Sequence, residues 1–128
     1  MVTRSEARIL KERALLFLEN AKSLIKQKVF DLAAFNLEQF CQLYLKHKLV
    51  LLLGDFPKTH SLRVLMREIQ KIKGDKRIED FLSRNASVVG NLESAYITSR
   101  YFPKVFEEEE VKQMLDFCEE FKRFVDKL

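Results

Sequence analysis

Polar side chains inside an otherwise apolar stretch of the chain are the first candidates for chemistry. Glu38, Gln42 and Lys46 recur at steps of four between residues 30 and 53, so on a helix they follow one stripe that turns by about 40° per step. Gln39 lies beside them. A lone buried charge is costly, so the carboxylate and the ammonium must find partners. They pair with each other, with neighbouring helices or with a second copy of the chain, and we favour this structural role over a polar binding cleft.

A second candidate is His60, which stands near an expected helix start in the segment Lys58–Leu62. Amide groups at the start of a helix attract anions, and histidine titrates near neutral pH, so His60 beside Lys58 suits a phosphate group. The alternative, which we rate slightly higher, is a histidine that bonds the backbone and fixes the loop. His47 lies between two lysines, and we expect it to be exposed or at an interface.

The third candidate is the segment Tyr96–Pro103. Tyr96 and Arg100 are four residues apart and share a helix face, so the guanidinium can lie over the ring. Its planar fork of donors could clamp a phosphate or, with equal weight, satisfy carbonyl groups at the end of the helix. The acidic run Glu107–Glu110 fits the first turn of a helix, where the helix dipole favours negative charge, better than it fits a metal site.

Helical periodicity positions all of these residues. Apolar residues recur at steps of three and four through most of the chain, and no strand alternation is present. We predict helices over about 5–28, 30–53, 61–73, 75–83, 88–100 and 107–128, with Ser5, Asp31 and either Thr59 or Ser61 as start signals and Gly54 and Gly74 as stops. Short connections favour antiparallel neighbours. The expected architecture is an up-and-down bundle of four long helices plus one short helix, in a single domain over residues 1–128.

The helix expected over residues 30–53 is apolar on most sides. Such a helix is central, covered by its neighbours or by a second subunit, and it therefore suggests a homodimer.

Composition excludes several classes of protein. The chain has 128 residues, of which 47% are hydrophobic, and its length suits one domain that needs neither disulfide nor metal. Cys41 and Cys118 are expected to be small buried hydrophobes. Residues 1–73 carry 14 Lys and Arg against 7 Asp and Glu, a balance of +7, and residues 74–128 carry 9 against 12, a balance of −3. The basic half could attract an anionic partner, although solvated helix faces explain the pattern equally simply.

Known catalytic and targeting patterns are also missing from the sequence. There is no phosphate-binding glycine loop, nucleophile turn or His-Glu-x-x-His pattern. No apolar run approaches the ~20 residues that span a membrane, and no secretory signal is visible. We expect a cytoplasmic protein without metal, cofactor or membrane contact.

Taken in order, several segments resemble the HEPN domain, the higher eukaryotes and prokaryotes nucleotide-binding family. The resemblance extends over about residues 5–127, and it rests on the segments Ala33–Gln39, Leu45-Lys46, Thr59–Leu62, Leu92 with Tyr96, and Arg100-Tyr101 ahead of Pro103.

The resemblance implies an all-helical bundle that forms a two-fold dimer and is often encoded beside a minimal nucleotidyltransferase. In many such pairs the HEPN protein is an RNA-cleaving toxin and the nucleotidyltransferase is its antitoxin, while other members bind nucleotides or act as partner modules. Active members carry an arginine and, four to six residues later, a histidine, which act together on RNA without a metal. Arg100 matches the arginine, but no histidine follows His60. His60 can replace the missing one only if the fold or a dimer mate brings it to Arg100.

Our first expectation is therefore a dimeric module that binds a nucleotide or nucleic acid and pairs with a minimal nucleotidyltransferase in a toxin–antitoxin-like system. Its expected ligand-binding residues are Lys46, His60, Tyr96, Arg100 and Tyr101. The expected structural polar residues are Glu38, Gln39 and Gln42. The alternative function is a metal-independent endoribonuclease that uses Arg100 with His60. A third hypothesis is a purely structural role, in which Glu38, Lys46 and Arg100 form an internal polar network.

Overall fold

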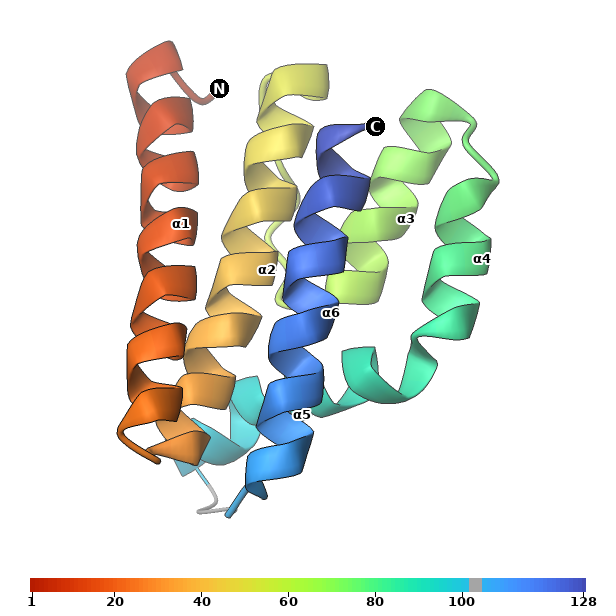
Figure 1. Ribbon diagram of the computed structural model, residues 1–128. Coiled ribbons are helices and arrows are strands. Elements are labelled where there is room, and N and C mark those ends of the chain that lie inside the picture. Colours follow the sequence, from red (N-terminus) through yellow and green to blue (C-terminus); the bar gives the residue numbers. More distant parts are fainter. Residues whose placement is uncertain (102–104) are drawn as a thin grey trace.

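Helices make up most of the chain. The computed structural model describes the backbone of residues 1–101 and 105–128 and the side chains of residues 1–97 and 105–128. Within these ranges there are six helices and no strand, as Figure 1 shows: α1 (Arg4–Lys26), α2 (Phe30–Leu53), α3 (Leu62–Lys73), α4 (Arg77–Arg84), α5 (Ala86–Tyr101) and α6 (Glu108–Asp126). The predicted all-helical fold is confirmed. The six helices correspond to the six ranges predicted from the sequence, and the expected description as four long helices and one short helix counted one helix too few.

Local chemistry sets the ends of these helices. Gly54 and Gly74 end α2 and α3 with positive φ angles of 83° and 62°, as expected of glycine at a helix end. Ser61 caps α3, since its Oγ accepts a hydrogen bond from the Val64 amide at 3.2 Å.

Two expected caps were wrong. Thr3 caps α1 in place of Ser5, because it forms a reciprocal capping box with Glu6. Asp31 lies within the first turn of α2, where its carboxylate accepts from the next amide, and Val29 holds the cap position without a side-chain bond.

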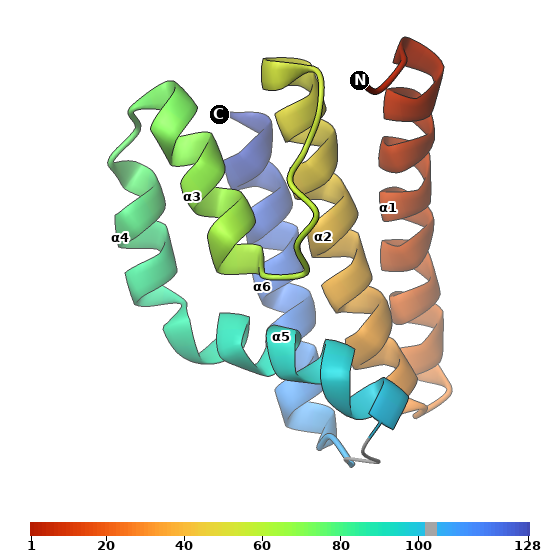
Figure 2. The ribbon, with the colours of Figure 1, turned by 180° about the vertical axis from the view of Figure 1, so that it is seen from behind.

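Helix α2 is the centre of the molecule. It contacts α1, α3, α5 and α6. In Figure 2, α5 crosses the lower part of α2, and the segment 54–61 runs down along α2 to the start of α3. The fully buried residues of α2 include Leu37, Phe40, Leu45 and Leu49. Four neighbouring helices of the same chain thus account for the apolar character of α2, so this feature does not by itself require a second subunit.

The two cysteines lie in this core. Cys41 of α2 and Cys118 of α6 are fully buried and free, as the sequence predicted. Their Sγ atoms are 3.6 Å apart, a contact that the sequence did not indicate. Burial, together with the neighbouring Cys118 thiol, raises the pKa of the Cys41 thiol well above its ordinary value. Both thiols therefore behave as packing groups.

Candidate functional site

His60 and Tyr96 form a stacked aromatic pair at the surface. His60 lies at the end of the segment 54–61, and Tyr96 lies on α5. The ring centroids are 4.5 Å apart with an interplanar angle of 24°, and Nε2 of His60 is 3.2 Å from the Tyr96 hydroxyl. Phe35 of α2 stacks on Tyr96 with centroids 6.4 Å apart. A side chain of α5 therefore holds the exposed His60 ring, rather than the backbone bond that we favoured from the sequence.

A cleft of about 450 Å³ opens beside the aromatic pair. It lies between the segment 54–61, the start of α3 and α5, and it is lined by Thr59, His60, Ser61, Glu93, Ser94, Tyr96 and Ile97. Three aliphatic hydroxyl groups, a carboxylate and two aromatic rings, one of which carries a phenol hydroxyl, thus meet at one opening. Such a lining can stack against a flat ring and exchange hydrogen bonds with its edge.

The start of α3 is occupied by a carboxylate of the same chain. Glu93 Oε1 accepts hydrogen bonds from the backbone amide of Arg63 at 3.4 Å and from Arg63 Nη1 at 3.1 Å. The Arg63 guanidinium also donates to the Ala86 carbonyl at 3.1 Å. Because Glu93 already satisfies the positive end of α3, a phosphate at the amides beside His60 would have to displace it.

A buried carboxyl group lies on α2 near this cleft. Glu38 has no exposed surface, and its two oxygens accept hydrogen bonds from Gln42 at 2.5 Å and from Gln39 at 2.9 Å. Burial raises the pKa of Glu38 to about 7, against the effect of the two amide bonds, and the nearby Glu93 carboxylate raises it further. Glu38 therefore exchanges a proton near neutral pH.

Lys46 extends the same stripe but does not line the cleft. Its Nζ atom donates to Gln42 Oε1 at 3.5 Å and lies 5.2 Å from the centre of the Phe56 ring. Burial lowers the pKa of Lys46, and the Glu38 carboxylate partly offsets this effect. The structure thus joins Lys46 to Glu38 and Gln42, and it joins His60 to Tyr96.

Arg100 and Tyr101 are the last two residues of α5, and their side chains lie outside the described residues. The backbone of Arg100 follows that of Tyr96 by four residues, about 6 Å along the helix axis. His60 therefore lies beside a residue one helical turn before Arg100. The histidine that active family members carry after this arginine is absent from the sequence.

Sequence reasoning did not find Phe35, Arg63 or Glu93. Each belongs to the site only because segments distant in sequence meet: Arg63 and Glu93 are 30 residues apart, and Phe35 and Tyr96 lie on α2 and α5. Glu93 lies on α5 but accepts a hydrogen bond at the start of α3, and no local sequence pattern predicts such a contact between two helices.

A sequence model of the HEPN domain matches residues 7–128 of the chain. The chain belongs to the HEPN family. The family resemblance seen in the sequence is thereby confirmed over nearly the whole length, and membership supports a function connected with nucleotides or RNA. HEPN domains typically function as dimers. A search of curated proteins found no significant sequence match.

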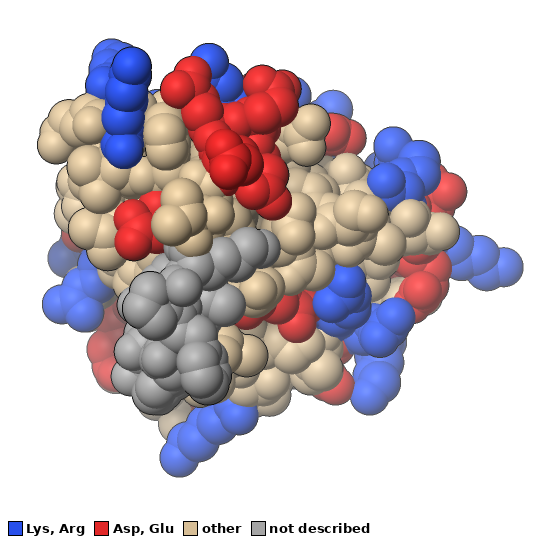
Figure 3. All heavy atoms as spheres, turned by 90° about the horizontal axis from the view of Figure 1, so that it is seen from below, with Lys and Arg blue, Asp and Glu red and all other residues tan. Residues whose placement is uncertain are grey.

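The acidic start of α6 borders the lower face of this HEPN domain. The Glu107 amide donates to Glu110 Oε1 at 3.0 Å, and Glu108 pairs with Lys112 at 2.8 Å, so the run caps its own helix. In Figure 3, acidic side chains gather at one edge, while uncharged residues form much of the visible centre. Among the residues that the structure describes, no group of three or more His, Cys, Asp or Glu is placed to hold a metal ion.

None of the helices, as far as they are described, has the length and hydropathy needed to cross a membrane.

Proposed function

We propose that this HEPN protein is a dimeric module that binds a nucleotide or RNA in the cleft beside His60 and Tyr96. The observation that carries the proposal is the stacked pair of rings on an open cleft. A nucleic-acid base that stacks on an aromatic side chain gains about 1–3 kcal/mol, and this gain needs no particular base. The hydroxyl groups of Thr59 and Ser61 each accept one backbone hydrogen bond and can still donate a hydrogen bond to the base edge.

Arg100 is the proposed phosphate-binding residue of the same site, with Tyr101 beside it. An arginine fork is suited to phosphate oxygens, and Arg100 follows Tyr96 by one helical turn. Lys46 is the more remote member of the proposed set and adds positive charge at Phe56 of the segment 54–61. A base on the aromatic pair and a phosphate at Arg100 together describe a nucleotide lying along the second half of α5.

Fluorescence anisotropy with a single-stranded RNA that carries hydroxyl groups at both ends tests this proposal. His60→Ala removes half of the stacked pair and should weaken binding about tenfold or more. Arg100→Ala should weaken binding with little change in melting temperature, whereas a purely structural role for Arg100 predicts a large fall in that temperature. His47→Ala is the matched control, because it removes the other histidine of the chain from outside the cleft. Equal RNA affinity of wild type and His60→Ala would refute the proposed site.

The contact between His60 and Tyr96 favours a second candidate function, the metal-independent cleavage of RNA. The 3.2 Å contact between His60 and Tyr96 fixes a histidine nitrogen about one turn before Arg100, where it could take the proton of a ribose 2′-hydroxyl while Arg100 stabilises the phosphate. Incubation of labelled RNA in EDTA distinguishes the two functions. Cleavage by wild type that falls by about 10²–10⁴-fold in His60→Ala establishes the enzyme. RNA that is bound but not cleaved by wild type would exclude the enzyme and support the binding module.

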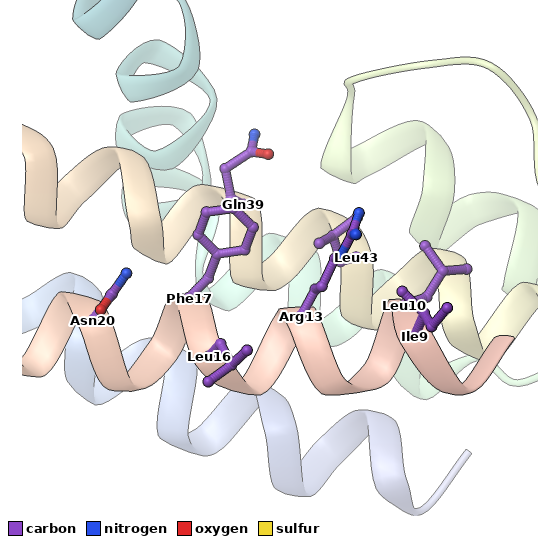
Figure 4. Close-up of a pocket in the computed structure, with 8 residues that line it drawn as sticks. All are labelled: Ile9, Leu10, Arg13, Leu16, Phe17, Asn20, Gln39 and Leu43. Atoms are coloured by element: carbon purple, nitrogen blue, oxygen red, sulfur yellow. The ribbon is translucent and has the colours of Figure 1, made fainter. Parts of the chain in front are cut away.

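The dimer part of the proposal is supported by the family and by an apolar groove between α1 and α2. Figure 4 shows this groove, which has a volume of about 570 Å³ and includes Ile9, Leu16, Phe17 and Leu43. Leu16 is 65% exposed and Ile9 is 41% exposed, which is unusual for such large apolar side chains. A second copy of the chain that presents the same groove would cover both residues.

Light scattering tests the dimer. Wild type should have twice the mass of the 15.2 kDa chain, and Leu16→Glu should return it to the mass of one chain. Leu53→Glu is the control, since Leu53 is similarly exposed, at 58%, but lies outside the groove. A 15.2 kDa wild-type species would remove the dimer from the proposal.

The partner part of the proposal, a minimal nucleotidyltransferase in a toxin–antitoxin-like pair, rests on the family resemblance. Co-expression with a nucleotidyltransferase encoded beside this chain tests it, and failure of the two proteins to copurify would count against it.

A further inference from the structure

A second cleft lies at the other end of the bundle. It has a volume of about 260 Å³ and is enclosed by α1, α2 and α6, and it is lined by Lys11, Tyr44, His47, Lys48, Leu51, Lys122, Val125 and Asp126. It shares no lining residue with the cleft beside His60. Figure 1 shows the upper parts of these three helices, away from α5. His47, which we expected to be exposed or at an interface, is half-buried at this cleft.

The carboxylate in this cleft is neutralised by its own neighbours. Asp126 accepts a hydrogen bond from the Tyr44 hydroxyl and forms an ion pair with Lys122 at 3.2 Å. The Lys122 ammonium also lies 5.7 Å from the centre of the Tyr44 ring. These three side chains form one polar group, and the Asp126 carboxylate also acts at longer range on Lys11 and His47.

Two further cations line the cleft without a bonded partner among the described residues. Within the part of the chain that the structure describes, neither Lys11 of α1 nor Lys48 of α2 forms an ion pair or a side-chain hydrogen bond. Both line the cleft together with His47. The net charge of the cleft is therefore two positive charges when His47 is neutral, and the groups come from separate helices that meet at one hollow.

The charges of this cleft also act on the pKa of His47. Its pKa is lowered first by burial and then by the positive charges of Lys11 and Lys48, and the Asp126 carboxylate opposes these effects. The imidazole thus feels both lysines, as it must if the three groups surround one small space.

We propose that this cleft binds a phosphate dianion, either free phosphate or the terminal phosphate of a nucleotide or an RNA end. Lys11 and Lys48 supply the two positive charges that match the dianion, and His47 supplies a hydrogen-bond donor. A phosphate monoester carries close to two negative charges at neutral pH, whereas an internal phosphodiester carries one. The site is therefore selective for terminal phosphate, and it is independent of the RNA cleft proposed above.

NMR of the two histidine rings tests the proposal, with inorganic phosphate as the first probe and sodium chloride of equal ionic strength as the reference. Bound phosphate should raise the pKa of His47 by about one pH unit, because a negative charge near an imidazole favours its protonated form. In inorganic phosphate, which carries no base to stack on the ring, the pKa of His60 should change less than the pKa of His47. An unchanged pKa of His47 in phosphate, in AMP and in RNA with a 5′-phosphate would overturn the proposal.

The sources of the phosphate are separated by paired ligands. AMP is compared with adenosine, and RNA with a 5′-phosphate is compared with the same RNA with a 5′-hydroxyl. A response to phosphate and AMP assigns a small-molecule site, while a response only to the 5′-phosphorylated RNA assigns an RNA-end site. Because the test of the His60 cleft uses RNA without terminal phosphate, failure of either site leaves the other result readable.

Lys48→Met provides a second test, because it should raise the pKa of His47 in the absence of phosphate and lower the affinity for phosphate. Loss of the lysine charge should raise the pKa of His47 in the absence of phosphate, since a repelling cation is gone. The same change should weaken phosphate binding about tenfold, because one charged partner is lost. Lys26→Met is the matched control, as Lys26 lies at the end of α1 outside the cleft. Unchanged phosphate affinity in Lys48→Met would contradict the assignment.

Discussion

Glu38 should make the protein less stable as the pH rises through neutrality. Its pKa in the folded protein is about 7, above the ordinary value of 4.5, because burial disfavours the charged form. Below about pH 4.5 the carboxyl is protonated in both the folded and the unfolded chain, so its stabilising contribution is complete. Above about pH 7 the folded protein must hold a buried negative charge, and the contribution is lost.

The size of this effect follows from the difference between the two pKa values. A shift of one pH unit corresponds to about 1.4 kcal/mol, so the free energy of unfolding should fall by about 3 kcal/mol in total, mostly between about pH 4.5 and about pH 7. Glu38 has no exposed surface, so solvent screening does not reduce this figure. His47 works in the opposite direction, because its lowered pKa makes its contribution grow as the pH rises.

Urea unfolding of wild type and Glu38→Gln between about pH 5 and about pH 8 isolates the contribution of Glu38. Glutamine cannot ionise, and it places a donor NH2 group where one of the two oxygens accepts from Gln39 or Gln42, so the variant should be about 1 kcal/mol less stable than wild type near pH 5. Near pH 8 the order should reverse, since only wild type then holds a buried charge. The effect of His47 is common to both proteins and cancels in their difference.

Glu120→Gln is the control for this experiment, because Glu120 is exposed and its variant should keep the wild-type dependence on pH. Parallel curves for wild type and Glu38→Gln would refute the reasoning, since they would mean that Glu38 keeps its ordinary pKa in the folded protein.

Three further predictions concern the fold. Gly54→Ala should lower the free energy of unfolding by about 1–2 kcal/mol, measured by urea unfolding, because an L-residue is strained at φ 83°; an unchanged midpoint would contradict the left-handed end of α2. Phe40→Ala should cost about 3–5 kcal/mol in the same assay, as its ring is fully buried, while Leu53→Ala at an exposed position should cost far less; equal losses would be inconsistent with this core. The thiols of Cys41 and Cys118 should react with a disulfide reagent only at the rate of unfolding, since both are fully buried; prompt reaction in native buffer would show that α2 and α6 do not enclose them.

The helices were predictable because their signals are local. Apolar spacing of three and four residues marks the inner face of a helix, and a glycine such as Gly54 or Gly74 marks a helix end that needs a positive φ angle. Even so, local signals compete. Thr3 and Ser5 are both good capping residues, and the reciprocal bond with Glu6 decides in favour of Thr3.

The candidate site was only partly predictable because it depends on which distant segments meet. The sequence singled out His60 and Tyr96 as separate candidates, yet their 4.5 Å stacking follows from the path of the segment 54–61, which runs along α2 to the start of α3. Glu93 gave no signal at all, although it occupies the helix start at which a phosphate was considered. The apolar character of α2 suggested a second subunit, but four helices of the same chain cover it.

Photo-crosslinking locates bound RNA most directly. A single-stranded RNA that contains 4-thiouridine and has hydroxyl groups at both ends is irradiated with the protein, and the attached peptides are identified by mass spectrometry. The account predicts crosslinks within residues 59–61 and 93–97, which line the cleft, and loss of these crosslinks in His60→Ala. Crosslinks confined to α1, α4 or α6, or unchanged by His60→Ala, would contradict the claim that this HEPN domain binds RNA beside His60 and Tyr96.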